Sequence, residues 1–266
     1  MAGFPVPRNS AFLLLPIVAL SGLAEAAVRL RYRPAAGAAW VYATERKDSV
    51  RSVAGKDGQV GYRRIEQSVS PLRIESGGSW TARLATDSVW SSGNAWAGRN
   101  RFEEHLYRTA VAGDTLTLSE TGAAEPPLDR FFPFLLALPE GPVSEDDAWP
   151  VEWTGHSATP FEGTVRVSGN AMLYRVDAAG TDTLAVCVVR LDMRTELKTV
   201  IREPFQSITH FYTCTESANG VAWFNVKKGL VHKAVFEWQG EATVKTPLTA
   251  DVYGKASHVT TRWINP

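Results

Sequence analysis

The sequence predicts a mainly β protein with antiparallel strands and one short helix or plug near residues 128–138. Apolar and polar residues alternate at period two along most of the chain, as expected for strands with one buried face. Short segments containing Gly, Asn or Asp separate the alternating runs, and these residues suit tight reversals. Strands joined by such short links are antiparallel, because a parallel return needs about a dozen residues or more.

The first alternating run, Val28–Arg33, puts three apolar residues on one face and three arginines on the other, which predicts a half-buried strand. Similar runs predict strands at Trp40–Thr44, Tyr62–Val69, Trp80–Trp90, Phe102–Thr109, Thr115–Ser119, Val151–Thr154, Thr164–Ser168, Leu173–Val176, Leu184–Met193, Ile208–Thr215, Ala222–Val226, Leu230–Trp238 and Val259–Ile264. Turns are expected at Lys56–Gly58, Ala112–Asp114, Ser168–Asn170, Ala179–Asp182 and Lys227–Gly229. The pattern fits one continuous sheet and two stacked sheets equally well.

One apolar segment, Phe131–Pro139, breaks the alternation and contains no polar residue. The prolines in and beside it argue against a central strand. We expect a short helix or a crossing segment, which either plugs one end of the β core or acts as a lid over a lipophilic cavity. Its candidate ligand-binding residues are Phe131, Phe132, Phe134 and Leu135.

Residues 1–26 have the composition of a secretory signal peptide, with an apolar core at residues 11–20 and a small-x-small pattern at Ala24–Ala26. That core is about half of the roughly 20 apolar residues that cross a bilayer, so no transmembrane anchor is expected in the mature chain. We expect cleavage near Ala26 and a periplasmic or secreted protein. Residues 27–266 would form a single β-rich domain, or two similar halves that meet near 126–148.

The charge balance argues against nucleic acid as a partner. The full chain carries 28 basic and 28 acidic residues, and removal of residues 1–26 takes one of each, Arg8 and Glu25. A neutral chain offers no electrostatic attraction for nucleic acid or for an anionic surface.

Cys187 and Cys214 are the two cysteines of the chain. An even number of cysteines in an oxidising compartment usually forms bridges. A hairpin with arms at Leu184–Met193 and Ser207–Thr215 would place the two cysteines opposite each other, which predicts a Cys187–Cys214 disulfide.

No standard catalytic signature occurs in the sequence: there is no nucleophile elbow, P-loop, dinucleotide fingerprint or HExxH motif. The pairs Glu103/His105 and His210/Cys214 would each share a strand face, but each lacks the further ligands that a metal needs. No metal and no cofactor is therefore predicted. Whether the chain is an enzyme stays open, because two distant carboxylates could still form a hydrolase site.

Tryptophan supplies the better candidate residues, since the chain has nine. Trp149 and Trp153 are four residues apart and share a strand face, where they either pack the core or bind a ligand. Trp90 and Trp96 flank or lie within the stretch 91–100, which contains Gly and Ser and is typical of an exposed loop.

Three stretches carry a resemblance to a known group of proteins: Arg31–Tyr42, with the pattern Arg-Tyr-x-Pro-x-x-Gly-x-x-Trp-x-Tyr, Pro139–Trp149, and the hairpin Ala222–Leu230. The chain resembles uncharacterised bacterial envelope proteins that are similar to the periplasmic lipoprotein carriers. This resemblance implies a large curved antiparallel sheet or half-barrel around an apolar cavity, and it brings no catalytic residue. The carriers close that cavity with several helices, whereas only Leu128–Leu138 is a plausible helix here.

Three functions follow from these observations. The first is a non-enzymatic envelope protein that binds a small lipophilic molecule or an envelope component on the concave face of the sheet. The second is a carbohydrate-binding β-sandwich that uses the tryptophans. The third is a hydrolase with dispersed carboxylates.

Overall fold

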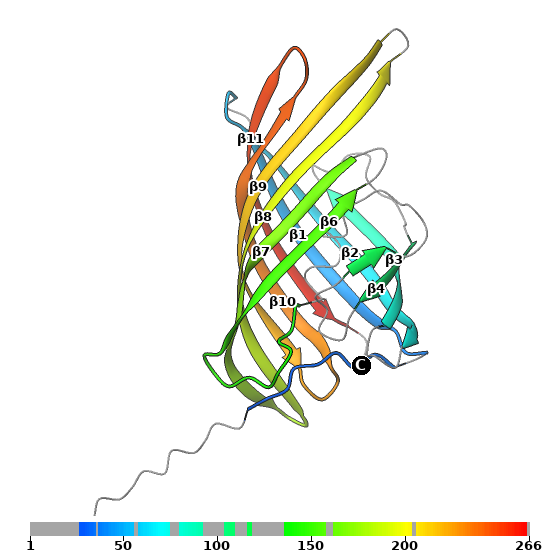
Figure 1. Ribbon diagram of the computed structural model, residues 1–266, viewed down its shortest axis with the longest axis vertical. Helices are drawn as coiled ribbons and strands as arrows, with labels where there is room; N and C mark the ends of the chain where they lie inside the picture. The colour runs from blue at the N-terminus through cyan, green and yellow to red at the C-terminus, as the bar shows by residue number, and fades with distance from the viewer. Residues whose placement is uncertain are drawn as a thin grey trace, which may run out of the picture.

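The computed structural model describes residues 27–35, 37–55, 58–74, 80–92, 104–109, 116–118, 136–157, 162–203 and 206–264. These residues form one 11-stranded sheet with the order β5-β4-β3-β2-β1-β11-β10-β9-β8-β7-β6. Every strand pair is antiparallel, which confirms the predicted fold class. The sheet is strongly curved and open, with β5 and β6 as its edge strands (Figure 1). The alternative of two stacked sheets is wrong.

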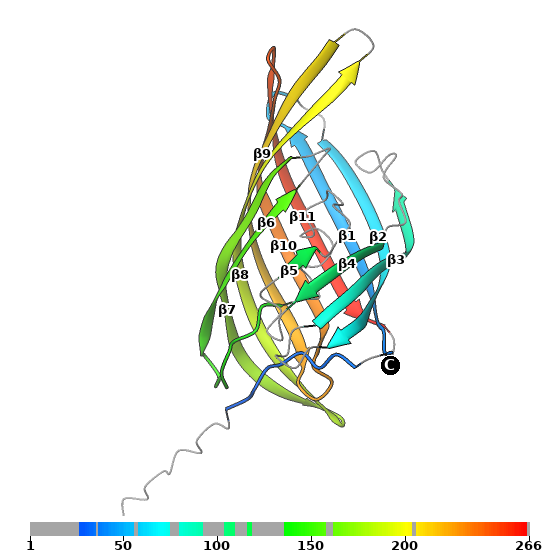
Figure 2. The same cartoon turned by 45° about the vertical axis from the view of Figure 1, so that its right-hand side comes forward.

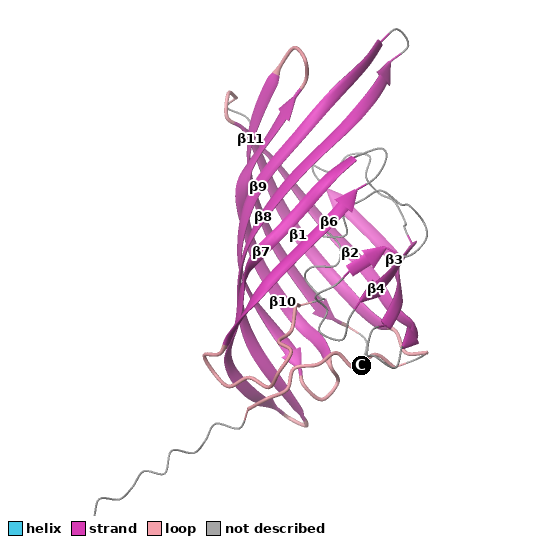
Figure 3. Ribbon diagram, viewed as in Figure 1, coloured by secondary structure: helices cyan, strands magenta, loops and turns pink. Residues whose placement is uncertain are grey.

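The strands are β1 Trp40–Ser52, β2 Gly58–Ile74, β3 Trp80–Ser92, β4 Glu104–Thr109, β5 Leu116–Leu118, β6 Ala148–Ser157, β7 Glu162–Ala179, β8 Asp182–Glu203, β9 Gln206–Asn225, β10 Leu230–Lys245 and β11 Ala250–Trp263. The described residues contain no helix (Figure 3). Nor do they include a helical segment with the length and apolarity that a membrane crossing requires.

The order of the strands in the sheet follows their order in the chain, except that the chain passes once from one edge of the sheet to the other. Strands β1 to β5 run outward from the centre, and β6 to β11 return until β11 pairs with β1. Residues 119–147 connect the two edge strands. The last part of this connection, Leu136–Leu138, is buried and has no regular secondary structure. It forms a plug against the sheet, whereas residues 119–135, with Phe131, Phe132, Phe134 and Leu135, lie outside the described residues.

Several predicted runs merge into longer strands. A turn was expected at Ser168–Asn170, but these residues lie inside β7. Gly169 is there for close packing, because a Cβ at this position would lie 2.0 Å from the carbonyl oxygen of Arg190. The expected turns at Gly180 and Gly229 are confirmed, with φ angles of +61° and +64°.

The Val28–Arg33 segment has the predicted faces but is not a strand of the sheet. Leu30 and Tyr32 are buried, and the three arginines are exposed. Its ladder is limited to an isolated bridge between Val28 and Val143. The segment crosses the open side of the sheet, close to one end (Figure 2). One side of the segment packs on the core and the other side faces solvent. Its residues therefore alternate between apolar and charged, as they would in a half-buried strand.

The predicted Cys187–Cys214 disulfide is wrong. Both cysteines are buried and unbonded. Strands β8 and β9 form the expected hairpin, but Cys187 lies opposite Ala222, and Cys214 lies opposite Thr195. A disulfide to Cys187 would require a cysteine at position 222 of β9. Cys214 lies eight residues away from that position, which is about 27 Å along the strand. The turn lies between Glu203 and Gln206, and this position fixes the register.

Candidate ligand site on the inner face

The two faces of the sheet differ sharply in chemistry. On β8, Cys187, Val189 and Leu191 point to the concave inner face and are buried, whereas the alternate residues Arg190 and Asp192 are exposed on the outer face. The neighbouring strands repeat this division. In this part of the sheet the concave face is therefore apolar, and charged side chains cover the convex face.

The lower part of the inner face forms a continuous apolar floor. We define the apolar floor as Trp40, Tyr42, Val69, Trp80, Trp149, Val151, Ala171, Leu173, Cys187, Val189, Ala222, Phe224 and Phe236, all of them buried. The ring of Phe236 packs against Gly220 of β9, where a Cβ would come within 2.2 Å of the ring. Glycine at 220 therefore makes room for the aromatic side chain of the neighbouring strand.

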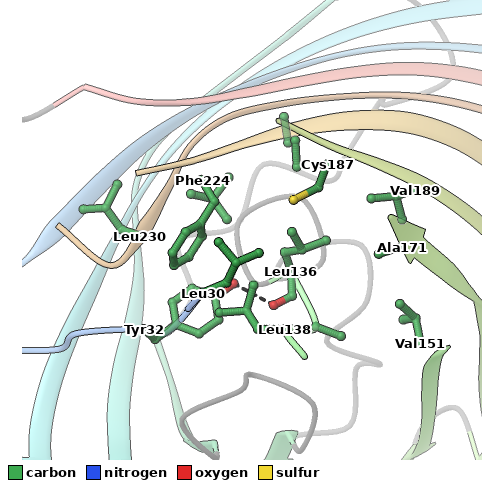
Figure 4. Close-up of a cluster of buried hydrophobic side chains, with 14 of the residues drawn as sticks. Leu30, Tyr32, Leu136, Leu138, Val151, Ala171, Cys187, Val189, Phe224 and Leu230 are labelled. Atoms are coloured by element: carbon green, nitrogen blue, oxygen red, sulfur yellow. Dashed lines mark hydrogen bonds between the residues drawn. The ribbon is translucent and has the colours of Figure 1, made fainter. Parts of the chain in front are cut away.

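Two segments that are not strands of the sheet cover the apolar floor. We call residues 27–33 and 136–143 the covering segments. They are joined to each other by two backbone hydrogen bonds between Val28 and Val143, of 2.7 and 2.9 Å. The Tyr32 hydroxyl donates a further hydrogen bond of 2.8 Å to the carbonyl oxygen of Leu136 (Figure 4). Burial raises the pKa of Tyr32 well above its usual value, so the hydroxyl keeps its proton and remains a donor.

Single hydrogen bonds fasten the covering segments to the sheet. The indole nitrogen of Trp149 donates to the carbonyl oxygen of Ala137 over 2.9 Å, and the amide of Arg33 donates to the carbonyl oxygen of Gly229 over 3.0 Å. Leu30, Leu136 and Leu138 add apolar contacts within the same buried cluster (Figure 4). The covering segments thus rest on the floor mainly through side chains, without a strand ladder.

Tyr32 lies at the centre of an aromatic group on the floor. Its ring centre lies 6.4 Å from that of Trp40, 6.5 Å from that of Trp80 and 5.4 Å from that of Phe224. The contact with Phe224 is edge-to-face, an arrangement that aromatic quadrupoles favour. This group fixes the first covering segment in place.

Three buried nitrogen atoms on or beside the floor have no hydrogen-bond acceptor among the described residues: Nε1 of Trp80, Nδ2 of Asn225 and Nε1 of Trp263. A buried donor without an acceptor costs about 1–3 kcal/mol. Trp80 and Asn225 are fully buried. An acceptor oxygen on a bound molecule would remove this cost.

Further along the inner face, charged and polar side chains replace the apolar ones. On β1, Arg46 donates to Asp48 over 2.7 Å, and the hydroxyl of Ser257 on β11 also donates to Asp48. The hydroxyls of Thr44 and Thr261 are 2.9 Å apart. We call these residues, with Lys255 and Glu216, the polar belt.

The second ion pair of the polar belt spans three strands. Nζ of Lys255, on β11, lies 3.0 Å from Oε1 of Glu216, on β9. Between them runs β10, whose residue at this register is Gly240. A Cβ there would lie 2.6 Å from Cγ of Glu216, so glycine leaves the space through which the two side chains meet.

Two cysteine thiols lie on the inner face, Cys214 beside the polar belt and Cys187 in the apolar floor. Nζ of Lys255 also lies 3.4 Å from the Tyr212 hydroxyl and 3.6 Å from the Cys214 sulfur. Burial raises the pKa of the Cys214 thiol, although Lys255 opposes the shift. Burial also raises the pKa of Cys187, to about 12. Both thiols are therefore neutral at physiological pH and are poor nucleophiles.

The sequence-predicted candidates do not form one site. Trp149 is buried in the apolar floor, whereas Trp90 is 59% exposed on the outer face of β3. Trp153 lies in β6 opposite Val167, and Trp96 is outside the described residues. The described residues contain no group of three His, Cys, Asp or Glu side chains that could hold a metal.

Sequence reasoning missed the polar belt. Its signal was present on β9, where Cys214, Glu216 and Ala218 share one face and an acid stands among small uncharged residues. A single charge on an otherwise apolar strand face predicts an oppositely charged partner on another strand of the same sheet face. The partner itself could not be identified, because strand order was unknown.

No family model and no curated protein matches this chain. Solved structures with partial likeness include the outer membrane protein OpdK from Pseudomonas aeruginosa, with a TM-score of 0.26, 8% identity, and coverage of 86% of this chain and 100% of that one. Pseudomonas aeruginosa OccK5 (OpdH) gives a TM-score of 0.26, 8% identity, and coverage of 88% and 100%. A mutant Rh. blastica porin gives 0.25, 10%, and coverage of 84% and 99%. At TM-scores of this size, the likeness carries no information on function.

Proposed function

We propose that this chain is a non-enzymatic, exported envelope protein that holds a lipophilic molecule on the concave face of its sheet. The observation that carries the proposal is the covered apolar floor. A large apolar surface of the sheet is closed off by two segments that are not part of the sheet and that single hydrogen bonds fasten to it. Opening these segments would present a lipophilic surface on one side of the protein only.

The buried donors and the polar belt support a ligand with both an apolar and a polar part. Nε1 of Trp80 lies in the floor and has no acceptor among the described residues, so a carbonyl or ester oxygen would pair with it. The ion pairs Arg46–Asp48 and Lys255–Glu216 lie further along the same face. They offer both signs of charge to a polar head group.

The resemblance to the periplasmic lipoprotein carriers agrees with this proposal. A curved antiparallel sheet with an apolar concave face is what that resemblance implies, and here the covering segments take the place of the helices. In both cases the apolar concave face is covered by segments that are not part of the sheet.

The two other functions have less support. Sugar binding by stacking needs exposed aromatic rings, and Trp149 is buried against the covering segment. A hydrolase needs a carboxylate that is free to act as acid or base, whereas Asp48 and Glu216 are each held in an ion pair.

The test is native mass spectrometry of the mature protein purified from a bacterial host without detergent. We expect a co-purifying lipid, or uptake of one during incubation with vesicles. The matched variants are Leu138→Ser, in the covering segment, and Leu72→Ser, an exposed leucine at 52% accessibility on β2. Leu138→Ser should change lipid occupancy, because it loosens the cover, and Leu72→Ser should leave it as in the wild type. A protein that stays free of lipid in every preparation would sink the proposal.

A further inference from the structure

We propose that a trough on the outer face of the sheet binds a neutral oligosaccharide that lies along β9. Strand β9 runs between β8 and β10. Glu216 and Ala218 of β9 are buried on the inner face. The alternate residues Thr215 and Ser217 therefore point to the outer face, where both are exposed. This site uses none of the tryptophans, and it does not rest on the ligand of the concave face.

The trough has a volume of about 580 Å³ and spans four neighbouring strands. Its lining residues on the outer face form two rows, each with one residue from β7, β8, β9 and β10. The rows are Ser168, Asp192, Ser217 and Gln239, and Arg166, Arg194, Thr215 and Glu241. All eight residues are exposed. The serines and the threonine are short and the arginines are long, so the side chains enclose a polar hollow.

The protein leaves charged groups of the trough unpaired. Elsewhere on the outer face, opposite charges meet, as in the pair Arg175–Asp177 at 2.9 Å. In the trough, the side chains of Arg166, Asp192 and Glu241 make no ion pair and no hydrogen bond with the described residues. Their donors and acceptors are therefore available to a ligand.

The charges of the trough sum to zero, because two bases, Arg166 and Arg194, stand against two acids, Asp192 and Glu241. The two arginines lie directly opposite each other, and like charges in this position destabilise a sheet. Guanidinium groups can only donate hydrogen bonds, and carboxylates can only accept them. The ligand must therefore both accept and donate, and it carries no net charge. The neighbouring hydroxyls of a sugar have these properties.

The same features argue against a macromolecular partner of another class. No large apolar side chain is exposed among the lining residues, whereas protein interfaces rely on apolar and aromatic anchors. A peptide strand cannot extend the sheet here, since β9 is paired on both sides. A trough without net charge has no electrostatic attraction for nucleic acid.

The outer face of β9 extends the trough toward an aromatic ring. Phe211, Thr213, Thr215, Ser217 and Asn219 follow one another at every second position, and all of them are exposed. The ring of Phe211 is 48% exposed and lies six residues from Ser217, or about 20 Å along the strand. The apolar face of a sugar ring can pack on such an aromatic ring. A linear oligosaccharide can therefore occupy the trough and reach Phe211, whereas a disaccharide reaches the trough alone.

The test is a glycan array that carries neutral and acidic oligosaccharides of two to six units, probed with the full mature chain. The strongest binder and its disaccharide are then titrated by calorimetry. We expect a neutral linear hexasaccharide to bind best, and to bind about fivefold more tightly than its disaccharide. Asp192→Ala/Glu241→Ala should weaken binding of both sugars at least tenfold, because hydrogen bonds to charged acceptors are lost. Phe211→Ala should weaken hexasaccharide binding about fivefold and leave disaccharide binding unchanged.

The matched controls are Glu66→Ala/Asp177→Ala, two carboxylates on the outer faces of β2 and β7, and Tyr174→Ala, whose ring is 50% exposed on β7. These variants should bind the hexasaccharide as the wild type does. Urea unfolding midpoints should agree for all variants, since surface ion pairs contribute little to stability. The proposal is overturned if no glycan binds, if acidic glycans bind more tightly than neutral ones, if chain length has no effect, or if the controls weaken binding as much as the trough variants.

The two proposed sites can be tested separately. Lipid occupancy by native mass spectrometry should remain unchanged in Asp192→Ala/Glu241→Ala, and Leu138→Ser should bind the hexasaccharide as the wild type does. A failure of the trough is therefore distinct from a failure at the concave face.

Discussion

Lys255 and Glu216 form a 3.0 Å ion pair between two strands that are not neighbours, across the backbone of Gly240. The side chain of Glu216 is 7% exposed and that of Lys255 is 21% exposed. Adjacent strands are about 4.8 Å apart, so the pair spans roughly 10 Å of sheet. Such a contact requires both a long side chain and an empty position between the strands.

Gly240→Ala should therefore destabilise the protein by about 2–4 kcal/mol, because overpacking forces the backbone or the ion pair to move. A Cβ at this position would lie 2.1 Å from the carbonyl oxygen of Thr215, which is a backbone atom. The measurement is urea unfolding. The matched control is Gly254→Ala on β11, where the nearest atom to a Cβ, the carbonyl oxygen of Arg51, is 3.9 Å away. Equal effects of the two substitutions would contradict the role assigned to Gly240.

Lys255→Met should lower the free energy of unfolding by about 3 kcal/mol or more, because it leaves the Glu216 carboxylate buried without its partner. The double variant Lys255→Met/Glu216→Leu should recover most of this loss, since no charge is then buried alone. Urea unfolding of both single variants and of the double variant gives the coupling free energy. Additive effects would show that the two side chains do not stabilise each other.

The antiparallel class was predictable from the sequence because period-two alternation is a local property. The register of the cysteines was not, because it depends on where a hairpin turns, and an error of a few residues changes every pair. The turn between Glu203 and Gln206 places Cys187 opposite Ala222. The continuity of β7 was not predicted either. Gly169 was interpreted as a turn residue, whereas it allows close packing inside the strand.

The sequence indicated one residue of the apolar floor and assigned the segment that covers it to the wrong structure. Trp149 was a candidate from its strand pattern, and the structure places it under the covering segment. Tyr32 was assigned to a strand, since its alternation with arginines has the same period in a segment that lies across the sheet as in one that belongs to it. The polar belt was not predicted, because Lys255 and Glu216 are 39 residues apart (255 − 216) in the sequence and no local pattern links them.

Cys187 makes stability depend on pH in the alkaline range. Burial raises its pKa from 9.0 to about 12, so the folded state holds the thiol proton more tightly than the unfolded state does. The stabilisation is fully present below pH 9 and is lost as the pH rises toward 12, with a slope of up to about 1.4 kcal/mol per pH unit.

Replacement by alanine isolates this contribution from that of other alkaline groups. Cys187→Ala removes the thiol at a position opposite Ala222 and Leu173, so its unfolding free energy should fall less steeply between pH 9 and 11 than that of the wild type. Urea unfolding under reducing conditions at several pH values measures the two slopes. If the unfolding free energies of the two proteins fall with equal slopes, the Cys187 thiol is not buried and protonated in the folded state. Iodoacetamide provides an independent check, because both thiols should resist labelling at pH 8 in the folded state and react on unfolding.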